Sequence, residues 1–410
     1  MAIASHNHRG TSRITLYAGT ALVAQLLLLG IWELRYFVLN DPGAPVLAWD
    51  FEVFWSAARV TLEHGAAAVF SQQTLTAVES TVSRLHNAAP WPYPPTFLLV
   101  VVPFGMLPYG PAFAVFAALG VATYALMLRG LAAGLERPYL VFAAAFPGVS
   151  ATLLAGQNSL LTAAAVGCAL SAMPRRTAVT ALCIAALAIK PQFGVLFPLA
   201  LLCSRQWKLL ISTGICTLAF GALSIAALGR EAWTAFAGFL PTFNQVVVEH
   251  GGYLWTGMPT VFAMSRVVGL PVGAAYAVQA VVALPAVAAM MFLWLRGARY
   301  GLRAAALVVT TLLIQPYFMF YDLCWLVVPI VLLLRDGKTA ALDRIEWTIL
   351  LAAWLLPLQA VFAVYFKFPC QLAPLVLIAL LAMIVRRHLM SPGDASAVLP
   401  ARETEASTAR

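Results

Sequence analysis

Two carboxylates stand among large apolar side chains in the run WDFEVFW, which covers residues 49–55 and follows the first hydrophobic segment. An ionised carboxylate held against apolar surface is poorly solvated, so such a group is usually paired or functional. We therefore take Asp50 as the leading candidate for the reacting group. Two other interpretations stay open: Asp50 and Glu52 are interfacial acids that reach water, or Asp50 is the N-cap of the helix that follows.

Basic residues near the same membrane boundary could hold a phosphate and neutralise a phosphate leaving group as its charge develops. The candidates are, in order, Lys190, Arg266 and Arg230. The alternative for each is a side chain that extends to lipid head groups, which fits Arg230 best because it lies at the end of a span. His250 could also bind phosphate or transfer a proton, but a solvated loop histidine is the more common case.

Several polar side chains could hydrogen-bond a sugar. Gln157 and Asn158 lie in a break between two apolar segments, where a tight turn would also favour Asn. Asp322 could orient a cation or a sugar, or it could be the N-cap of a span that starts at Leu323. The predicted sugar- or acceptor-binding group comprises Glu52, Tyr93, Gln157, Asn158, Tyr321 and Asp322.

The composition identifies the broad class of protein. Hydrophobic residues make up 62% of the 410 residues and charged residues 10%, whereas soluble domains carry about 25% charged residues. Apolar segments run from Ile14 to about Val385, which excludes a soluble enzyme with one anchor and predicts an all-α polytopic membrane protein. No C-x-x-C pair, zinc motif or P-loop occurs, so we expect no metal and no bound nucleotide cofactor.

The apolar segments predict the domain organisation. Residues 1–13 are a polar N-terminus, 14–387 a transmembrane domain and 388–410 a disordered cytoplasmic tail. The first span, Ile14 to Val38, is too long for a cleaved signal and is interpreted as an uncleaved anchor. The extracytoplasmic loop 39–110 holds two predicted interfacial helices, at 51–64 and 72–86, and a re-entrant segment at 96–107.

Eleven further apolar segments follow, which gives twelve predicted crossings with the first span. Several are shorter than the ~20 residues needed to cross straight, as is tolerated around a cavity inside a bundle. They are residues 111–128, 139–154, 158–173, 177–189, 192–204, 209–228, 272–295, 303–318, 322–335, 345–366 and 369–385.

The distribution of basic residues predicts the orientation. Eighteen of the 25 Lys and Arg residues fall in one set of loops, and the other seven are Arg35, Arg59, Arg84, Lys190, Arg230, Arg266 and Lys367. This bias is the positive-inside signature, and it predicts cytoplasmic termini in a bacterial-type plasma membrane. If residues 96–107 crossed the membrane completely, the later loops would change sides and the bias would be lost. The net charge of +9 therefore reflects orientation, and we expect no nucleic-acid partner.

With this orientation, five polar breaks face the extracytoplasmic side. They are the stretch around Asp50, residues 156–159, residues 190–192, the segment 230–266, and residues 315–322. Irregular backbone at membrane depth survives only where it is buried in protein or lines a wet cavity. The breaks therefore predict one cavity at the outer leaflet, suited to transferring a group from an anionic, lipid-linked donor.

The order of these motifs resembles glycosyltransferase family 87, which carries the DUF2029 label and has the GT-C membrane fold. The resemblance covers roughly residues 14–385 and rests on the motifs Asp50-Phe51, Trp55, Ala58-Arg59, Gly65, Trp91-Pro92-Tyr93-Pro94-Pro95, Gly156-Gln157-Asn158, Lys190-Pro191 and Pro316-Tyr317 with Tyr321-Asp322. It implies a GT-C-like bundle and a polyprenyl-phosphate-mannose-dependent mannosyltransferase. The family's donor-phosphate histidine has no clear match here.

The resemblance also implies a mechanism and partners. Asp50 matches the aspartate that acts as the base in this class, and the reaction is a metal-independent, inverting transfer of a hexose to a lipid or glycan acceptor at the extracytoplasmic face. Two rivals remain: a secondary transporter, which suits twelve crossings and broken helices, and a glycan polymerase or ligase that uses the same lipid carriers. A transporter usually has related halves, and we find no repeat between residues 14–205 and 209–385.

Overall fold

The computed structural model describes residues 2–41, 46–82, 89–368 and 371–390, with side chains from residue 14 onwards. Throughout these ranges the chain forms helices and loops and no strand. The all-helical prediction is therefore confirmed. Most of the predicted tail lies outside the described residues, as do the side chains of the predicted N-terminal segment. Residues 388–389 of the predicted tail are helical, because α18 continues to Leu389.

Six helical segments of the described chain are long and apolar enough to cross a membrane. They are Ile14–Val38 (within α1, Ala2–Glu33, and η1, Leu34–Val38), Tyr109–Leu131 (α5), Arg137–Ala155 (α6, Arg137–Ala144, and α7, Gly148–Ala155), Trp207–Leu228 (α11), Val272–Leu295 (α14) and Arg344–Tyr365 (α17). The chain is thus a polytopic helical membrane protein, and the total of twelve crossings stays a prediction.

The remaining helices are shorter. The predicted interfacial and re-entrant region contains α2 (Trp49–His64), η2 (Ala66–Phe70), α3 (Gln72–Glu79), α4 (Pro95–Val101) and η3 (Val102–Met106). The middle of the chain forms α8 (Ser159–Ala172), α9 (Thr177–Ala186), η4 (Leu187–Ile189), η5 (Pro191–Phe193), α10 (Leu196–Cys203), α12 (Arg230–Phe243), η6 (Asn244–Glu249), η7 (Gly252–Gly257) and α13 (Val261–Val267). The last part forms α15 (Tyr300–Leu313), η8 (Phe320–Leu326), α16 (Val327–Asp336) and α18 (Ala373–Leu389).

Several predicted segments differ from the observed helices. The helix predicted at 72–86 ends at Glu79, and residues 83–88 lie outside the described ranges. The span predicted at 139–154 is broken between α6 and α7, where Pro147 cannot donate a backbone hydrogen bond. The segment predicted at 303–318 stops at Leu313, because Pro316 disfavours helical backbone in the residue before it. The region from Arg230, predicted as a long polar break, is largely helical.

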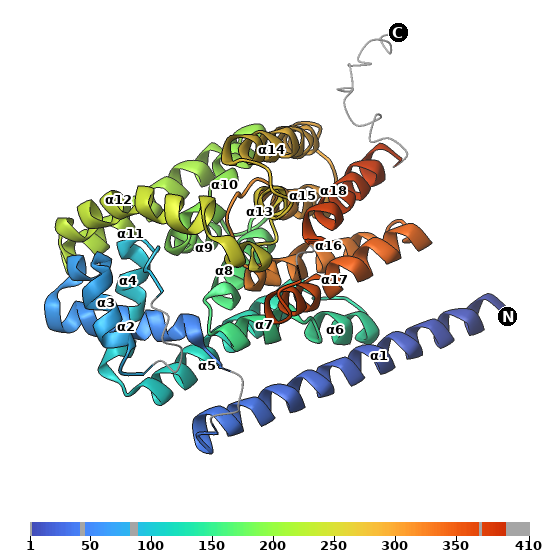
Figure 1. Ribbon diagram of the computed structural model, residues 1–410. Coiled ribbons are helices and arrows are strands. Elements are labelled where there is room, and N and C mark those ends of the chain that lie inside the picture. Colours follow the sequence, from blue (N-terminus) through green and yellow to red (C-terminus); the bar gives the residue numbers. More distant parts are fainter. Residues whose placement is uncertain (1, 42–45, 83–88, 369–370, 391–410) are drawn as a thin grey trace, which may run out of the picture.

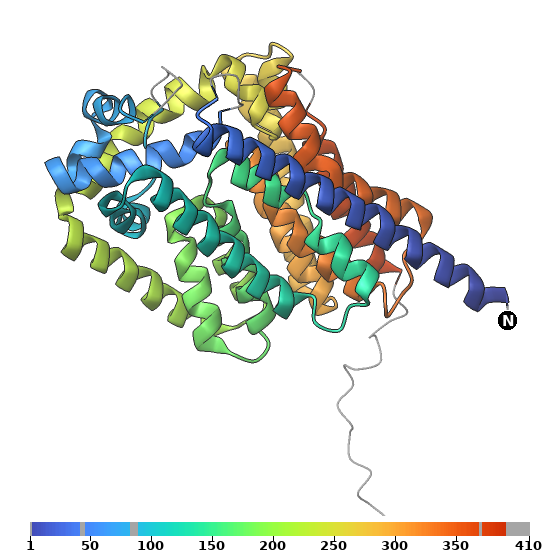
Figure 2. The same ribbon diagram turned by 90° about the horizontal axis from the view of Figure 1, so that it is seen from below.

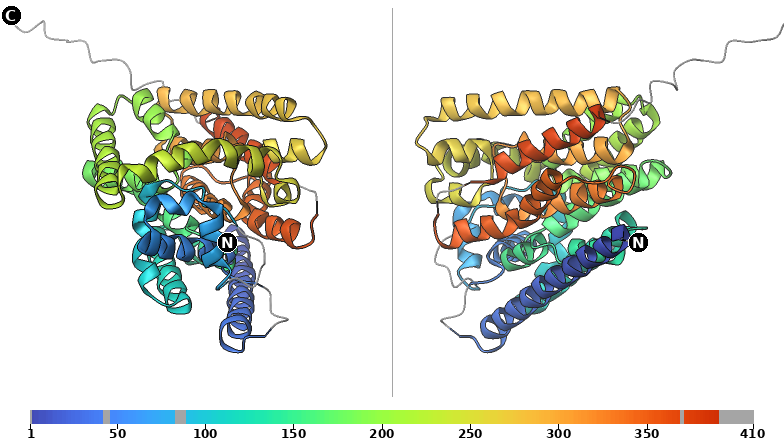
Figure 3. Two further views of the ribbon diagram at one scale, coloured as in Figure 1. Left: turned by 60° about the vertical axis from the view of Figure 1, so that its left-hand side comes forward. Right: turned by 90° about the vertical axis from the view of Figure 1, so that its right-hand side faces the viewer.

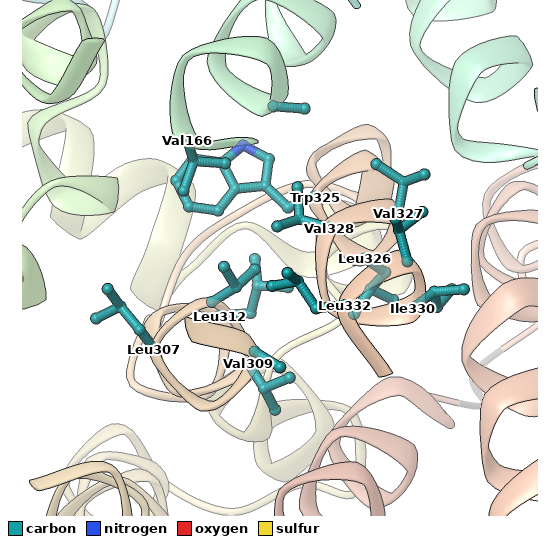
Figure 4. Packing of buried hydrophobic residues seen from close by; sticks show 14 of the residues in the cluster. Val166, Leu307, Val309, Leu312, Trp325, Leu326, Val327, Val328, Ile330 and Leu332 are labelled. Carbon is teal, nitrogen blue, oxygen red and sulfur yellow. The ribbon is translucent and has the colours of Figure 1, made fainter. Parts of the chain in front are cut away.

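The helices divide into a central core and a lipid-facing periphery. α1 and α14 lie on opposite sides of the bundle (Figure 3), and α1 runs along its surface (Figure 2). α15, η8 and α16 are almost entirely buried. Figure 4 shows the indole of Trp325 in η8 packed near Val166 of α8, and its Nε1 donates to Thr162 Oγ1 at 3.0 Å. Tyr321 and Asp322 of the polar site described below lie in η8, within this buried centre.

Opposite ends of the molecule carry different chemistry. α2, α3 and α12 gather at the end away from the N-terminal end of α1 (Figure 1). Ion pairs link several of the basic loops with one another: Arg387 contacts Asp336 at 2.9 Å and Glu346 at 2.6 Å, and Arg299 contacts Asp336 at 2.8 Å. The predicted cytoplasmic regions around residues 299, 336–346 and 387 therefore meet in the fold.

Candidate active site

The N-terminus of α2 positions the two acids predicted from the sequence. Ala48 precedes the helix with a positive φ of 56°, and its amide donates to Leu154 O at 2.9 Å. Asp50 and Glu52 follow in the first turn, while Phe51 is fully buried among aromatic rings. Asp50 is therefore not the N-cap, and Glu52, which is 3% exposed, does not reach water. The interpretation of Asp50 as an N-cap is therefore wrong, and so is the interpretation of Glu52 as an acid that reaches water.

Gly156 allows the α7–α8 turn to approach α2. Its φ is +72°, and a Cβ at this position would lie 2.8 Å from Ala48 Cα and 2.8 Å from Phe51 Cβ. A left-handed backbone conformation and a contact this close both require glycine. The turn that carries Gln157 is thus packed directly against the helix that carries Asp50.

Gln157 ties three distant segments together. Its Nε2 donates to Tyr93 Oη at 2.7 Å and to Tyr321 Oη at 3.1 Å, and its Oε1 accepts from the amide of Asn158 at 2.8 Å. Gln157 and Asn158 lie in the α7–α8 turn, as the turn interpretation predicted. The side chain of Asn158 is fully buried, and neither its Oδ1 nor its Nδ2 has a partner among the described residues.

Lys190 and Asp322 form a buried ion pair. Lys190 Nζ lies 2.8 Å from Asp322 Oδ1, and both side chains are 4% exposed. Ser159 Oγ donates to the same oxygen at 2.5 Å, and the ring of Tyr321 lies 5.2 Å from the ammonium. Lys190 therefore does not extend to head groups. Asp322 lies inside η8 and is not the N-cap of a span, because the cap position belongs to Met319.

Two cavities meet at this cluster. The first, of about 440 Å³, is lined by Lys190, Asp322 and the polar side chains of Gln192, Asn244 and Gln315. The second, of about 590 Å³, is lined by three carboxylates, those of Asp50, Glu52 and Glu79. The residues that line both cavities are Pro92, Tyr93, Phe243, Tyr317 and Tyr321. A cavity lined by the Lys190–Asp322 ion pair and an acidic cavity therefore share one wall, which is mostly aromatic.

A comparison with known protein families identifies the chain. The model of glycosyltransferase family 87 matches residues 91–316, which is more than half of the sequence. The chain belongs to glycosyltransferase family 87. It is therefore a membrane glycosyltransferase, in agreement with the resemblance seen in its motifs. No curated protein and no solved structure matches it.

The matched region contains part of the polar cluster of this family 87 chain. Tyr93, Gln157 and Lys190 lie within it, whereas Asp50 precedes it and Asp322 follows it. The family match therefore supports the class of reaction, and it covers neither Asp50 nor Asp322.

Asp50 is a buried carboxylate with a raised pKa. Its Oδ2 is buried and makes no hydrogen bond among the described residues. Burial raises the pKa of Asp50 to about 7, although hydrogen bonding from Gln157, the charge of Lys190 and hydrogen bonding from Tyr321 each oppose the rise. A base is most effective when its pKa lies near the working pH. In this glycosyltransferase, Asp50 would be largely ionised slightly above neutrality.

Three of the predicted phosphate-binding residues are not among the residues that line the two cavities. Arg230 is 86% exposed and pairs with Glu231, as expected for a side chain at a span end. Arg266 stacks on Trp255 at 4.6 Å and donates to the backbone oxygens of Leu270 and Glu249. His250 is exposed, with Nδ1 2.8 Å from Gln245 O. Of the four candidates, only Lys190 lines a cavity with the other polar residues.

Glu79 is a cavity residue that the sequence prediction missed. It lies on α3, where it lines the second cavity and is 5% exposed. The signal was its spacing: Leu75, Val78, Glu79 and Val82 fall on one face at helical intervals, so the carboxylate sits on an apolar stripe. Among the residues that the structure describes, no three His, Cys, Asp or Glu side chains are grouped to hold a metal ion. Metal independence stays a prediction.

Proposed function

We propose that this family 87 chain moves a hexose, with mannose as the first candidate, from a polyprenyl phosphate to a hydroxyl group of a lipid or glycan acceptor. Asp50 is the general base and the anomeric configuration is inverted. The observation that carries the proposal is the wall that the two cavities share, since Asp50 lines the acidic cavity and the Lys190–Asp322 pair lines the other.

The reaction is a single displacement. The Asp50 carboxylate takes the proton of the acceptor hydroxyl, whose oxygen forms the new bond to the anomeric carbon. The bond between that carbon and the phosphate oxygen breaks, and polyprenyl phosphate leaves with the electron pair. Because phosphate is a good leaving group when cations stabilise it, no general acid is required.

The cavity lined by the Lys190–Asp322 pair is the proposed donor site. Lys190 uses one N–H to bind Asp322, and its ammonium also lies 5.8 Å from the rings of Tyr93 and Phe193. An ammonium has three donors, so the remaining N–H groups are available to a phosphate oxygen. Asp322 orients this ammonium, and Gln157 holds the two tyrosines of the shared wall.

The proposed location is the extracytoplasmic face of a bacterial-type plasma membrane, with both termini in the cytoplasm. The support is the separation of chemistry within the fold, because the paired basic loops lie together and the acidic cavity lies among α2, α3 and their neighbours. We include no metal or organic cofactor in the reaction.

Replacing Asp50 tests the assignment directly. We expect Asp50→Asn to fold and to lose at least about a hundredfold of transfer, since general-base catalysis contributes 10²–10⁴-fold. The measurement is transfer of label from radiolabelled polyprenyl-phosphate-mannose in membranes, with Glu63→Gln, an exposed acid of the same helix, as the control. Near-normal transfer by well-folded Asp50→Asn protein would refute the role. Uptake of label into vesicles without product would instead favour a transporter.

A further inference from the structure

Three tyrosines line both cavities, and they differ in what holds their hydroxyl groups. Tyr93 and Tyr321 are 8% and 5% exposed, and the Oη atom of each accepts a hydrogen bond from Gln157 Nε2. Tyr317 is more exposed than either, and its hydroxyl makes no hydrogen bond to the residues that the structure describes. Of the three hydroxyl groups in the shared wall, the one on Tyr317 is therefore available to a ligand.

Contacts that do not involve this hydroxyl hold Tyr317 in place. The residue lies in the non-helical stretch between α15, which ends at Leu313, and η8, which begins at Phe320. Thr260 Oγ1 donates to the backbone oxygen of Pro316 at 3.1 Å, and the ring of Tyr317 packs edge-on against Phe243 with 5.3 Å between centroids. The backbone and the ring are thus fixed before a ligand arrives, as a substrate-binding residue requires.

Tyr317 also lies near the charged groups of both cavities. Asp50 lines only the second cavity and Asp322 only the first. Burial raises the pKa of Tyr317, and the charges of Asp50 and Asp322 raise it further. The phenol therefore stays protonated near neutral pH, so that its hydroxyl both donates and accepts hydrogen bonds. A sugar hydroxyl also does both, whereas an ionised phosphate oxygen only accepts and finds its cation at Lys190.

We propose that Tyr317 binds the transferred sugar, with its hydroxyl hydrogen-bonded to one hydroxyl group of the hexose. The inference rests on the proposed function, in which the attacking and leaving oxygens lie on opposite sides of the anomeric carbon. The sugar ring then lies between Asp50 and Lys190, where the wall shared by the two cavities faces it. Tyr317 orients the ring for attack and neither takes nor gives up a proton.

Tyr317→Phe removes the hydroxyl and keeps the ring. The purified full chain in phosphatidylcholine nanodiscs is titrated with farnesyl-phosphate-mannose and with farnesyl phosphate, and calorimetry gives both affinities. We expect Tyr317→Phe to bind the mannosyl compound about threefold to tenfold more weakly, as for one neutral hydrogen bond, and farnesyl phosphate as the wild type does. Tyr253→Phe, at a tyrosine that is 70% exposed and lines only the second cavity, should leave both affinities unchanged.

The two ligands make the outcome decisive. Equal weakening of both would show a phosphate contact and overturn the proposal, as would unchanged binding of the mannosyl compound. A Tyr317→Phe protein that does not fold would also overturn it, because the hydroxyl would then be required by the protein itself. If the wild type shows the expected binding pattern but transfers no mannose, only the transferase proposal is refuted.

Donors that each lack one sugar hydroxyl identify the contact. The 2-, 3-, 4- and 6-deoxy forms of farnesyl-phosphate-mannose are titrated against the wild type and Tyr317→Phe. We expect one of them to lose the same factor of about threefold to tenfold with the wild type and to lose nothing further with Tyr317→Phe, because that variant already lacks the bond. Losses that add in the variant for every deoxy form would contradict a direct hydrogen bond from Tyr317 to the sugar.

Discussion

At the scale of single residues, Asp50 depends on its surroundings for its chemistry. An aspartate in water is ionised well below neutrality, whereas burial of Asp50 raises its pKa to about 7. The rise makes the carboxylate a stronger base at the cost of keeping part of it protonated at neutral pH. The hydrogen bonds of Gln157 and Tyr321 and the charge of Lys190 limit that cost, because each lowers the pKa of Asp50.

The raised pKa predicts a pH dependence of transfer. Only ionised Asp50 accepts a proton, so the rate should rise from about pH 5.5 to 8 with a midpoint near 7, measured with radiolabelled donor at saturating concentration. A flat profile over this range would contradict the assignment.

Stability provides an independent check of the same pKa. Between about pH 4 and 7 the folded chain holds a proton on Asp50 that the unfolded chain has lost, so the free energy of unfolding falls as pH rises. Relative to wild type, Asp50→Asn should gain stability through this window and keep the gain above it, in thermal unfolding scans.

Replacing the residues of the Lys190–Asp322 pair should change both the stability of the protein and its binding of the donor. Lys190→Ala leaves Asp322 buried without its counterion, which costs about 3–5 kcal/mol. Adding Asp322→Asn should restore much of that stability, because the uncompensated charge is gone. Both the single and the double variant should raise the apparent KM for the donor more than that for the acceptor. Equal effects on the two KM values would count against the phosphate role.

At the scale of elements, the placement of α2 depends on the α7–α8 turn. Gly156 contacts the start of α2 and has a positive φ, while Gly134 has a φ of +82° with open space around its Cα. Alanine substitutions at the two glycines therefore distinguish the cost of left-handed backbone from the cost of crowding at the site.

Gly156→Ala should lower both stability and transfer. Left-handed backbone costs an alanine roughly 1–2 kcal/mol, and overpacking against Ala48 and Phe51 adds about 1–3 kcal/mol. Displacing Asp50 should also lower kcat, since small misplacements of a base are expensive. Gly134→Ala should show the strain alone, in unfolding midpoints and transfer rates. A comparable loss of kcat in both variants would show that the contact between Gly156 and α2 does not contribute to kcat.

Much of the element pattern follows from the sequence. The long helices α5, α11, α14 and α17 lie within a few residues of the predicted segments, because a continuous apolar run can satisfy its backbone in a membrane only as a helix. The predicted helix at 51–64 is confirmed as α2. The break at Pro147 and the helix α12 were missed, since the first lies in apolar sequence and the second mixes polar and apolar residues.

At the scale of the whole molecule, the charge bias predicts which end faces the cytoplasm. In a chain whose native cysteines are replaced, Ser80→Cys should react with a membrane-impermeant maleimide on intact spheroplasts, because Ser80 is exposed beside α3. Ala133→Cys, exposed after α5 among the basic loops, should react only after permeabilisation. The reverse labelling pattern would show that the topology is inverted and that the acidic cavity lies on the cytoplasmic side.

The sequence by itself determined the class of protein, the order of its helices and the breaks that carry its polar residues. Local features suffice for these, because hydropathy, proline and charge bias act over a few turns of chain. The resemblance in its motifs also pointed to the family that the comparison then confirmed.

Only the tertiary structure decided which of those polar residues meet. Lys190 finds Asp322 at a separation of 132 residues, and Gln157 reaches Tyr321 at a separation of 164. The tertiary structure also leaves Arg230, Arg266 and His250 out of the lining of both cavities. It places Glu79 in the lining of the second cavity. The physical reason is that every polar break presents groups that need hydrogen-bond partners. Only the packing of whole helices determines which of these groups meet.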